Sequence, residues 1–395
     1  MSTAERRASL ALAGVFALRM LGLFLVLPVF ALEAARLPGG DDPARVGLAM
    51  GIYGLAQALL QIPFGLASDR WGRKRVILAG LAVFATGSAL AALATSLEAL
   101  TLGRALQGAG AVSAAVTALL ADLTRETVRT KAMALVGISI AAMFALSLLA
   151  APPLAALIGL SGLFWLTGAL TLAGMAAVVW VVPPEPPRQP QPVRASLADA
   201  LRHADLLRLD FGVFALHTVQ MAMWVAVPGL LVAAGLPKAA HWHVYLPALL
   251  ASFAVMGGVL FRLERRGHLA AVLRVAVALL LLAQLGLGWA GAQHQGVLAL
   301  GAWLVLFFLG FNTLEASQPS LVSRLAPAHA RGAALGVYNT LQSLGLFAGG
   351  ALGGWLMRQA GTAGVFGISA ALCLLWLALT WTLRVPAPQP LARSA

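Results

Sequence analysis

The sequence predicts an all-α membrane protein with twelve transmembrane helices in two pseudo-symmetric six-helix bundles. Of its 395 residues, 60% are hydrophobic and only 10% are charged, whereas a soluble globular protein carries about 25% charged residues. Apolar runs of about 20 residues, the length that spans a bilayer, follow one another almost without pause. Ten-residue segments that alternate apolar and polar residues are not found, which argues against a porin-type barrel.

Apolar runs bounded by charged residues, glycine and proline predict the individual helices. The first six are expected at about residues 9–33, 46–68, 75–95, 98–122, 131–155 and 161–182. The second six are expected at about residues 207–234, 241–262, 270–290, 296–318, 331–356 and 362–384. The first run is too long for the core of a signal peptide, so we expect it to be retained as a helix.

The same runs divide the chain into four segments. Residues 1–182 are predicted to form the N-terminal six-helix bundle, and residues 207–384 the C-terminal one. Residues 183–206 are predicted to form a cytoplasmic linker, because its prolines cannot continue a helix. A short amphipathic helix is expected in the second part of this linker. Residues 385–395 would form a short cytoplasmic tail.

Positive charge is concentrated on alternate connections between the helices. The termini and the connections on their side hold 21 of the 27 Lys and Arg residues, and the other side holds only Arg36, Arg45, Lys238 and Arg358. Connections that face the cytoplasm are rich in Lys and Arg. We therefore expect a multi-pass protein of the bacterial cytoplasmic membrane with both termini in the cytoplasm. The net charge of +13 then reflects topology and not a nucleic-acid partner.

A compact charged loop separates the second and third predicted helices. It reads Gly65-Leu-Ala-Ser-Asp69-Arg70-Trp-Gly72-Arg73-Lys74. This pattern resembles the loop between helices 2 and 3 of major facilitator superfamily transporters, Gly-x-x-x-Asp-Arg-x-Gly-Arg-Arg/Lys. The resemblance implies the fold of that family.

The resemblance also implies a conformational switch in this loop. In the family, the loop aspartate meets helix 11 and the loop arginine pairs with an acid at the end of helix 4, only while the cytoplasmic side is closed. The residues that match are Gly65, Asp69, Arg70, Gly72, Arg73 and Asp122. A loop that only fixes the insertion topology is the alternative.

Further segments narrow the resemblance to the twelve-helix, proton-coupled drug-efflux branch. Leu100-x-x-x-Arg104-x-x-Gln107-Gly108 resembles a helix 4 motif whose arginine lies inside the membrane near the proton pathway. The segment from Arg19 to Pro28 resembles helix 1 of a bacterial member that carries a soluble domain after helix 12. The chain ends eleven residues after Arg384, so we expect no such domain here.

Ionisable residues inside the predicted helices are the candidate functional residues, because charge within a bilayer is costly. Four lie well inside helices: Arg19, Arg104, His217 and Glu315. Glu315 is interpreted as the one carboxylate among them, able to take up and release a proton. Histidine side chains change charge between pH 5 and 8. Together with Asn312, these four residues are predicted to couple protons or bind substrate.

Structural roles remain open for the same residues. Glu315 can pair with a nearby cation and hold the bundles together. His217 can be a neutral histidine hydrogen-bonded between helices. Arg104 can be a packing residue that extends toward the membrane surface.

The sequence thus predicts a proton-coupled antiporter that exports small apolar or amphipathic molecules by alternating access. Its expected partners are a small-molecule substrate, protons and the lipid bilayer, and a monomer is expected. A facilitator or proton symporter for a small polar metabolite is the alternative, and a transport-inactive sensor is another. An HExxH motif, a Ser/His/Asp set and a cysteine cluster are all absent from the sequence, so an enzyme, a metal site and a cofactor are not expected.

Overall fold

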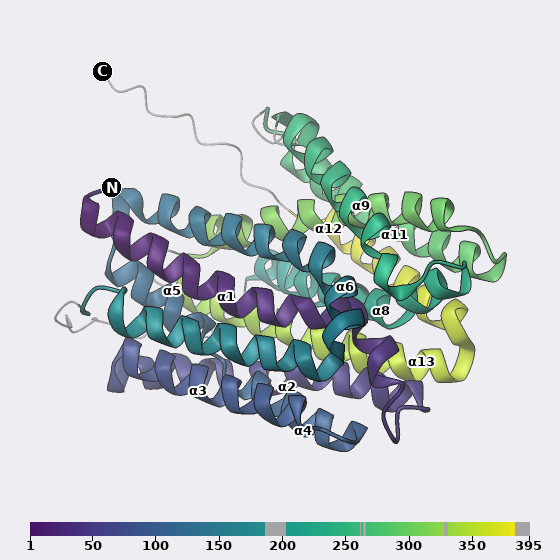
Figure 1. Ribbon diagram of the computed structural model, residues 1–395. Coiled ribbons are helices and arrows are strands. Elements are labelled where there is room, and N and C mark those ends of the chain that lie inside the picture. Colours follow the sequence, from purple (N-terminus) through teal and green to yellow (C-terminus); the bar gives the residue numbers. More distant parts are fainter. Residues whose placement is uncertain (186–202, 261, 264–265, 328–330, 384–395) are drawn as a thin grey trace.

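The computed structural model describes residues 1–185, 203–260, 262–263, 266–327 and 331–383. Within these residues, every regular element is helical (Figure 1). The elements are α1 (Thr3–Ala34), α2 (Pro43–Trp71), α3 (Arg73–Ala92), α4 (Leu97–Ala109), α5 (Ser113–Asp122), α6 (Glu126–Trp180), α8 (Ala204–Ala233), the 3₁₀ turn η1 (Lys238–Ala240), α9 (Trp242–Val255), the π-helical turn η2 (Met256–Leu260), α11 (Leu269–Ala292), α12 (Val297–Leu325) and α13 (Arg331–Trp381).

Helix α6 is two membrane spans joined by a reversal of the chain at Gly159. It has 55 residues, and a straight helix of that length would measure about 80 Å, against about 30 Å for the hydrocarbon core. Gly159 has φ 66°, a left-handed conformation that suits glycine. Ser139 donates a hydrogen bond to the Ala13 carbonyl at 3.4 Å, and Thr167 donates one to the Gly22 carbonyl at 3.0 Å. Both parts of α6 therefore lie along α1.

Helix α13 reverses in the same way at Gly361, which has φ 60°. A Cβ on Gly345 would lie 3.1 Å from the Cβ of His217, and the Trp376 ring lies beside Gly212. Positions 345 and 376 thus contact neighbouring turns of α8, although Gly361 separates them in the chain. The described residues contain ten segments long and apolar enough to cross a membrane. With a reversal in α6 and another in α13, these segments are consistent with the twelve predicted spans.

Two predicted helices have a different local form. The span expected at residues 98–122 is divided into α4 and α5, because Gly110 brings the backbone against α3, where a Cβ would lie 2.5 Å from the Gly80 carbonyl oxygen. The helix expected at residues 241–262 ends in the π-helical turn η2. The predicted amphipathic helix, most of the linker and the tail lie outside the described residues, and the boundaries of the two bundles remain predictions.

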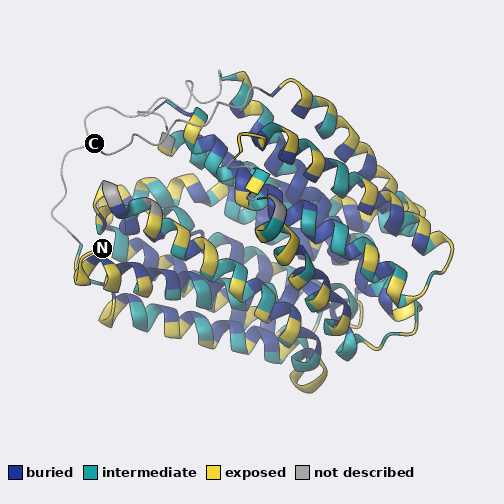
Figure 2. Ribbon diagram, turned by 90° about the horizontal axis from the view of Figure 1, so that it is seen from above, coloured by how far each residue is buried: buried dark blue, intermediate teal, exposed yellow. Residues whose placement is uncertain are grey.

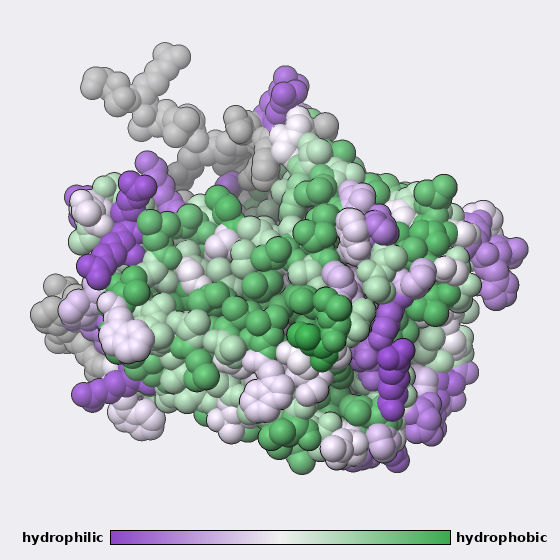
Figure 3. Space-filling model, in the orientation of Figure 1, coloured by the Kyte–Doolittle hydropathy of each residue, from purple (hydrophilic) through white to green (hydrophobic). Residues whose placement is uncertain are grey.

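The surface of the molecule is suited to lipid. Leu298 and Leu157 are 91% and 80% exposed, and water would penalise such exposure of large apolar side chains. Figure 3 shows a broad apolar band with polar side chains gathered at its two ends. In Figure 2, buried residues lie where helices meet and exposed residues lie on the outward faces. Apolar side chains therefore occupy both the buried and the lipid-facing positions, so the hydrophobicity of a residue does not predict its burial here as it does in a soluble protein.

The two ends of the molecule can be told apart. We call the end that holds Ser2, Gly72 and Val182 the N-terminal end, and the end that holds Ala35, Asp42 and Gly361 the opposite end. Exposed tryptophans lie close to both: Trp71, Trp180 and Trp381 at the N-terminal end, and Trp165, Trp289 and Trp355 at the opposite end. Tryptophan is enriched at both membrane interfaces, so these rings mark the limits of the membrane.

The two sets of helices meet mainly through α2 and α13. Their backbones approach so closely that a Cβ on Gly47 would lie 2.3 Å from the Gly350 carbonyl oxygen, and one on Gly54 would lie 2.5 Å from the Ser343 carbonyl oxygen. Nearer the middle, Gln57 donates a hydrogen bond to Ser343 Oγ at 3.0 Å. Small residues permit such contacts between membrane helices. This glycine contact closes the opposite end.

Replacing Gly350 by alanine is expected to open the contact between α2 and α13. A Cβ there would lie 2.7 Å from backbone atoms of Gly51, and overpacking of this kind costs about 1–3 kcal/mol. Spin labels at the exposed residues Leu48 and Leu352 should therefore move apart at the opposite end. Gly336→Ala is the control: it lies in the same helix with no neighbour within 4 Å, and it should leave the label distance unchanged. Equal distances in the two variants would contradict the assigned role of the contact.

Candidate functional site

Three polar side chains meet in the second half of the chain: His217 of α8, Glu315 of α12 and Gln342 of α13. Gln342 Nε2 lies 2.8 Å from His217 Nε2 and 3.3 Å from Glu315 Oε1. His217 Nε2 lies 3.5 Å from Glu315 Oε2. The sequence predicted His217 and Glu315 but missed Gln342. Its only sequence signal is a polar residue within a predicted apolar helix.

The surroundings fix the histidine and leave the carboxylate accessible. His217 Nδ1 lies 3.0 Å from the Val213 carbonyl oxygen, one helical turn back on α8, and the His217 ring packs edge-on against Phe311 at 5.9 Å. The His217 side chain is 6% exposed, whereas that of Glu315 is 39% exposed. The Glu315 side chain thus reaches the surface of the described structure, although its Oε2 atom is buried, whereas His217 does not reach that surface.

A second carboxylate, Asp210, is buried in α8 at 4% exposure, so the interpretation of Glu315 as the one carboxylate inside a helix was wrong. Asp210 lies only three residues after the expected helix start at about residue 207, so its place in the sequence did not indicate burial. Its neighbours Leu209 and Val213 are buried as well. Asp210 and Glu315 both act electrostatically on Tyr338 of α13, whose buried hydroxyl has no hydrogen-bond partner among the described residues.

Asn312 has a different neighbour from the one its predicted role implies. It lies on α12 close to Glu315 in sequence, but its amide donates a hydrogen bond to Ser252 Oγ of α9 at 2.8 Å. The structure shows no hydrogen bond from Asn312 to Glu315 or His217. Asn312 therefore ties α12 to α9 beside the cluster.

Arg19 and Arg104 come together in the first half of the chain, around Tyr53. Arg19 donates to the Tyr53 hydroxyl at 2.9 Å and to Ser113 Oγ at 3.1 Å. The Arg104 guanidinium lies 5.0 Å from the centre of the Tyr53 ring and donates to Gln107 Oε1 at 2.9 Å. These two arginines are 2% and 1% exposed.

Neutral groups surround both cations. Among the described residues neither arginine has an ion-pair partner, and the Nε of each has no hydrogen-bond acceptor. Aromatic faces attract such cations, and Phe84 lies 5.4 Å from Arg19. The predicted residues thus fall into two groups. Arg19 and Arg104 form a cationic centre, and His217 and Glu315 form the cluster with Gln342. No hydrogen bond or ion pair joins the cationic centre to the cluster among the described residues.

The charged loop is folded around Arg73 at the N-terminal end. Arg73 forms ion pairs with Asp69 and with Asp122 at 3.2 Å, and it donates to Ser68 Oγ at 2.7 Å. The Arg73–Asp122 pair is the one that the resemblance implies, but it forms here without the Asp69 contact that was expected to accompany it in the closed state. Gly72 has φ 107°, which a side chain would strain, and it forms the junction between α2 and α3.

The remaining loop residues support this geometry. Glu185 accepts hydrogen bonds from the backbone N–H groups of Arg73 and Lys74, so a carboxylate sits at the N-terminus of α3, where the helix dipole favours it. The Gly65 carbonyl accepts a bond from Ser68, and Arg70 is exposed in the last turn of α2. The expected contact between Asp69 and the start of α13 does not occur among the described residues.

Ion pairs join the two sets of helices at the opposite end. Lys238 of η1 pairs with Glu33 of α1, and Arg358 of α13 pairs with Asp42, next to α2, at 3.1 Å. The hydrogen bond from the Ala44 N–H and the charge of Arg358 hold the pKa of Asp42 below its ordinary value, against desolvation. The Asp42 pair therefore persists at neutral pH and is lost only as the pH falls through that lowered pKa.

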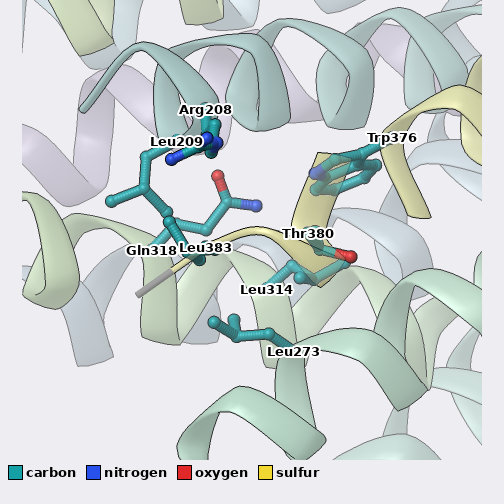
Figure 4. A pocket seen from close by; sticks show the side chains of 8 residues that line it. All are labelled: Arg208, Leu209, Leu273, Leu314, Gln318, Trp376, Thr380 and Leu383. Carbon is teal, nitrogen blue, oxygen red and sulfur yellow. The ribbon is translucent and has the colours of Figure 1, made fainter. Parts of the chain in front are cut away.

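Figure 4 shows a small cavity lined by residues of α8, α11, α12 and α13, and His217, Glu315 and Gln342 are not among its lining residues. The Gln318 amide points into it from α12 between Arg208 and Trp376, and neither Gln318 oxygen nor nitrogen has a hydrogen-bond partner among the described residues. Its volume is about 10 Å³, which suits about one water molecule. This cavity is too small for a substrate.

Tyr53 is expected to stabilise the fold through its hydroxyl. Tyr53→Phe would leave a buried Arg19 N–H without its acceptor, which costs about 1–3 kcal/mol, and would lower the unfolding temperature in detergent. Tyr245→Phe is the matched control, because the Tyr245 hydroxyl is buried without a described partner and its loss should not destabilise the protein. Equal destabilisation by the two changes would argue against the hydroxyl's role.

The comparisons with known proteins agree with this geometry. Residues 12–350 match the family model of the Major Facilitator Superfamily. The inner membrane transport protein YajR of Escherichia coli K12 is 44% identical over 390 residues, which cover 98% of this chain and 85% of YajR. This relative is the bacterial member whose segments the sequence resembles. The multidrug resistance protein MdtH of Proteus mirabilis is 28% identical, with 85% of this chain and 84% of MdtH covered.

Solved structures share the arrangement of helices. The nucleoside transporter NupG (TM-score 0.73, 15% identity) covers 95% of this chain and 99% of its own. The peptide transporter PepTSo (TM-score 0.75, 13% identity) covers 95% of this chain and 97% of its own. At these identities the likeness concerns the fold alone. The family match, the close relative and the shared fold together establish that this chain is a membrane transporter, not an enzyme, and that it belongs to the major facilitator superfamily.

Proposed function

We propose that the protein is a proton-coupled antiporter that exports small apolar or amphipathic molecules. The observation that carries this proposal is the cluster of Glu315, His217 and Gln342. A carboxylate and a histidine within hydrogen-bonding range of one amide, inside membrane helices, form a unit that can bind and release protons. Glu315, being 39% exposed, is the member that exchanges protons with water.

The described conformation supports access to Glu315 from the N-terminal end. Contacts between the two sets of helices run from the ion pairs of Glu33 and Asp42 to the Gln57–Ser343 hydrogen bond and the Phe144–Phe308 ring contact at 6.3 Å. Among the described residues, no hydrogen bond or ion pair joins the two sets beyond this level. Glu315 follows Phe308 on α12 in the direction of the N-terminal end.

Alternating access would then exchange these contacts for others. Opening the opposite end requires the glycine contact and both ion pairs to break. We propose that Asp69 at that stage meets the start of α13 and closes the N-terminal end, with Arg73 and Asp122 holding the loop in place. A proton taken up at Glu315 from one side would be released to the other, and substrate would move in the reverse direction.

The cationic centre would serve the same cycle without carrying the proton. Arginine does not deprotonate in proteins, so Arg19 and Arg104 present fixed positive charge in the first half of the chain. We propose that they act on the substrate or on the proton at Glu315 electrostatically when the two halves move together.

The substrate class rests on relatives and on composition. MdtH relatives are named multidrug resistance proteins, and the side chains that meet between the halves next to the cluster are apolar, as in the packing of Phe24 and Phe308 on Phe144. The charge asymmetry supports a cytoplasmic N-terminal end, so substrate would be taken up from the cytoplasm.

Glu315→Gln is expected to abolish accumulation driven by a pH gradient, because the amide cannot bind a proton. Exchange of substrate between equal compartments should survive, and Glu315→Asp should retain part of the activity with a shifted pH profile. Proteoliposomes loaded with a fluorescent amphipathic dye measure both rates, with Glu98→Gln, 63% exposed at the opposite end, as the control. A Gln variant that still concentrates the dye at the wild-type rate would remove Glu315 from the mechanism.

Asp69→Asn is expected to favour the conformation described here. Its charge would meet a helix N-terminus only when the N-terminal end is closed, an interaction of about 0.5–2 kcal/mol. Spin labels on the exposed residues Leu66 and Gly332 should therefore populate longer distances in the variant. Asp41→Asn, exposed at the opposite end, is the control. Unchanged distances in a folded Asp69→Asn protein would count against the switch.

The charge asymmetry predicts that both termini lie in the cytoplasm. A phosphatase reporter fused after Arg384 should be inactive, because it needs the periplasm, and a fluorescent protein fused at the same place should fold. The inverse result would overturn the orientation and the direction of transport with it.

A further inference from the structure

We propose that Gln342 is a positioning residue: its hydrogen bonds change when His217 and Glu315 bind protons, and this change alters the contact between the two halves. The proposal rests on the proposed function, because it assigns the regulation of the same proton-binding pair. It follows from hydrogen-bond donors and acceptors that can be counted atom by atom.

The hydrogen bonds of His217 define its tautomer. The Val213 carbonyl can only accept, so His217 Nδ1, at 3.0 Å, must carry the hydrogen. In a neutral imidazole with Nδ1–H, the other nitrogen is an acceptor. Gln342 Nε2, at 2.8 Å, donates to it. The described geometry is therefore that of a neutral His217 without a proton on Nε2.

The Gln342 amide also donates a hydrogen bond to Glu315. Gln342 Nε2 has a second N–H, and Glu315 Oε1 lies 3.3 Å away. A first proton can bind Glu315 Oε2, which lies 3.5 Å from His217 Nε2 and has no hydrogen-bond partner among the described residues; both bonds from Gln342 then remain. A second proton, bound at His217 Nε2, turns that nitrogen into a donor toward Gln342. The amide must then rotate by half a turn to present its oxygen.

Few other charges act on the pair. Tyr338 of α13 lies within the electrostatic reach of both Glu315 and Asp210 of α8. Three cations of neighbouring elements have partners elsewhere: Arg19 of α1 bonds to Tyr53, Lys238 of η1 pairs with Glu33, and Arg274 of α11 lies over Trp381. The charged residues of α2 lie near its two ends: Arg45 near the opposite end, and Asp69 and Arg70 at the N-terminal end. Helix α9 holds no acidic or basic residue besides His243, which stacks with Trp242 close to the opposite end. Gln342 is thus the one side chain that bonds to both His217 and Glu315 among the described residues.

The position of Gln342 on α13 connects the pair to the interface. Gln342 faces α8 and α12, whereas the next residue, Ser343, accepts a hydrogen bond from Gln57 of α2 at 3.0 Å. Ser343 also lies at the glycine contact, where its carbonyl oxygen meets Gly54. A rotation of the Gln342 amide, or its withdrawal from the pair, therefore acts on the turn of α13 that holds the halves together.

The tautomer and protonation of His217 test this proposal directly. The whole protein is labelled with ¹⁵N at histidine, placed in lipid bilayers and measured by solid-state NMR from pH 5 to 9, with His217→Asn assigning the signal. At high pH the neutral ring should carry its hydrogen on Nδ1. In Gln342→Met, which keeps the length of the side chain and removes its donors, His217 should bind its proton at a pH higher by roughly one unit.

Gln284→Met is the matched control. Gln284 is a fully buried glutamine of α11 without a described hydrogen-bond partner, so its loss should leave the His217 titration unchanged. A wild-type ring with its hydrogen on Nε2 overturns the proposal even if Gln342→Met fails to fold. An unchanged titration in a folded Gln342→Met protein overturns it as well. A Glu315→Gln protein that still accumulates dye would instead contradict the proposed function. The two results are distinguishable, because the His217 spectra of the wild-type and Gln342→Met proteins are measured independently of transport.

Discussion

The hydrocarbon core of a membrane contains no water, so every backbone polar group inside it needs a partner from the protein, and a buried charged side chain is costly. For the backbone this leaves helices, and the chain changes direction inside its long helical segments only at Gly159 and Gly361, where a left-handed residue makes a tight reversal. For side chains it means that a buried charge persists only where neighbours have been arranged around it. The cationic centre and the cluster of His217, Glu315 and Gln342 are both outcomes of that requirement.

These two centres satisfy the requirement differently. Arg19 and Arg104 are almost fully buried and depend on hydroxyl, amide and aromatic partners, and their charge is permanent because guanidinium does not lose its proton in proteins. Glu315 is partly accessible and pairs with a histidine, and both can change charge. Proton exchange therefore belongs with the second half of the chain, and fixed positive potential with the first. Relative movement of the halves would change the distance between the fixed charge and the exchangeable one.

Closure of the opposite end depends on contacts that are individually weak. Apolar side chains gain little from meeting each other in lipid, so the α2–α13 contact relies on close packing of glycine backbones. The Asp42 pair is partly exposed, and exposed ion pairs contribute little to stability; the Glu33 pair lies at the same end. A closed end built in this way can open at modest cost, which alternating access requires.

The sequence by itself determined the membrane class, the places of the helices and the family, because these depend on the length of apolar runs and on short contiguous motifs such as Asp69-Arg70-Trp-Gly72-Arg73. It also identified Glu315, His217 and the two arginines, since a charge within an apolar run is visible locally. It did not show that Gln342 joins the first pair, that Tyr53 joins the second, that Asn312 turns toward Ser252, or that Asp210 is buried. Those facts depend on which face each helix turns toward its neighbours. In a membrane protein that choice is made by backbone packing between distant segments, and only the tertiary structure decides it.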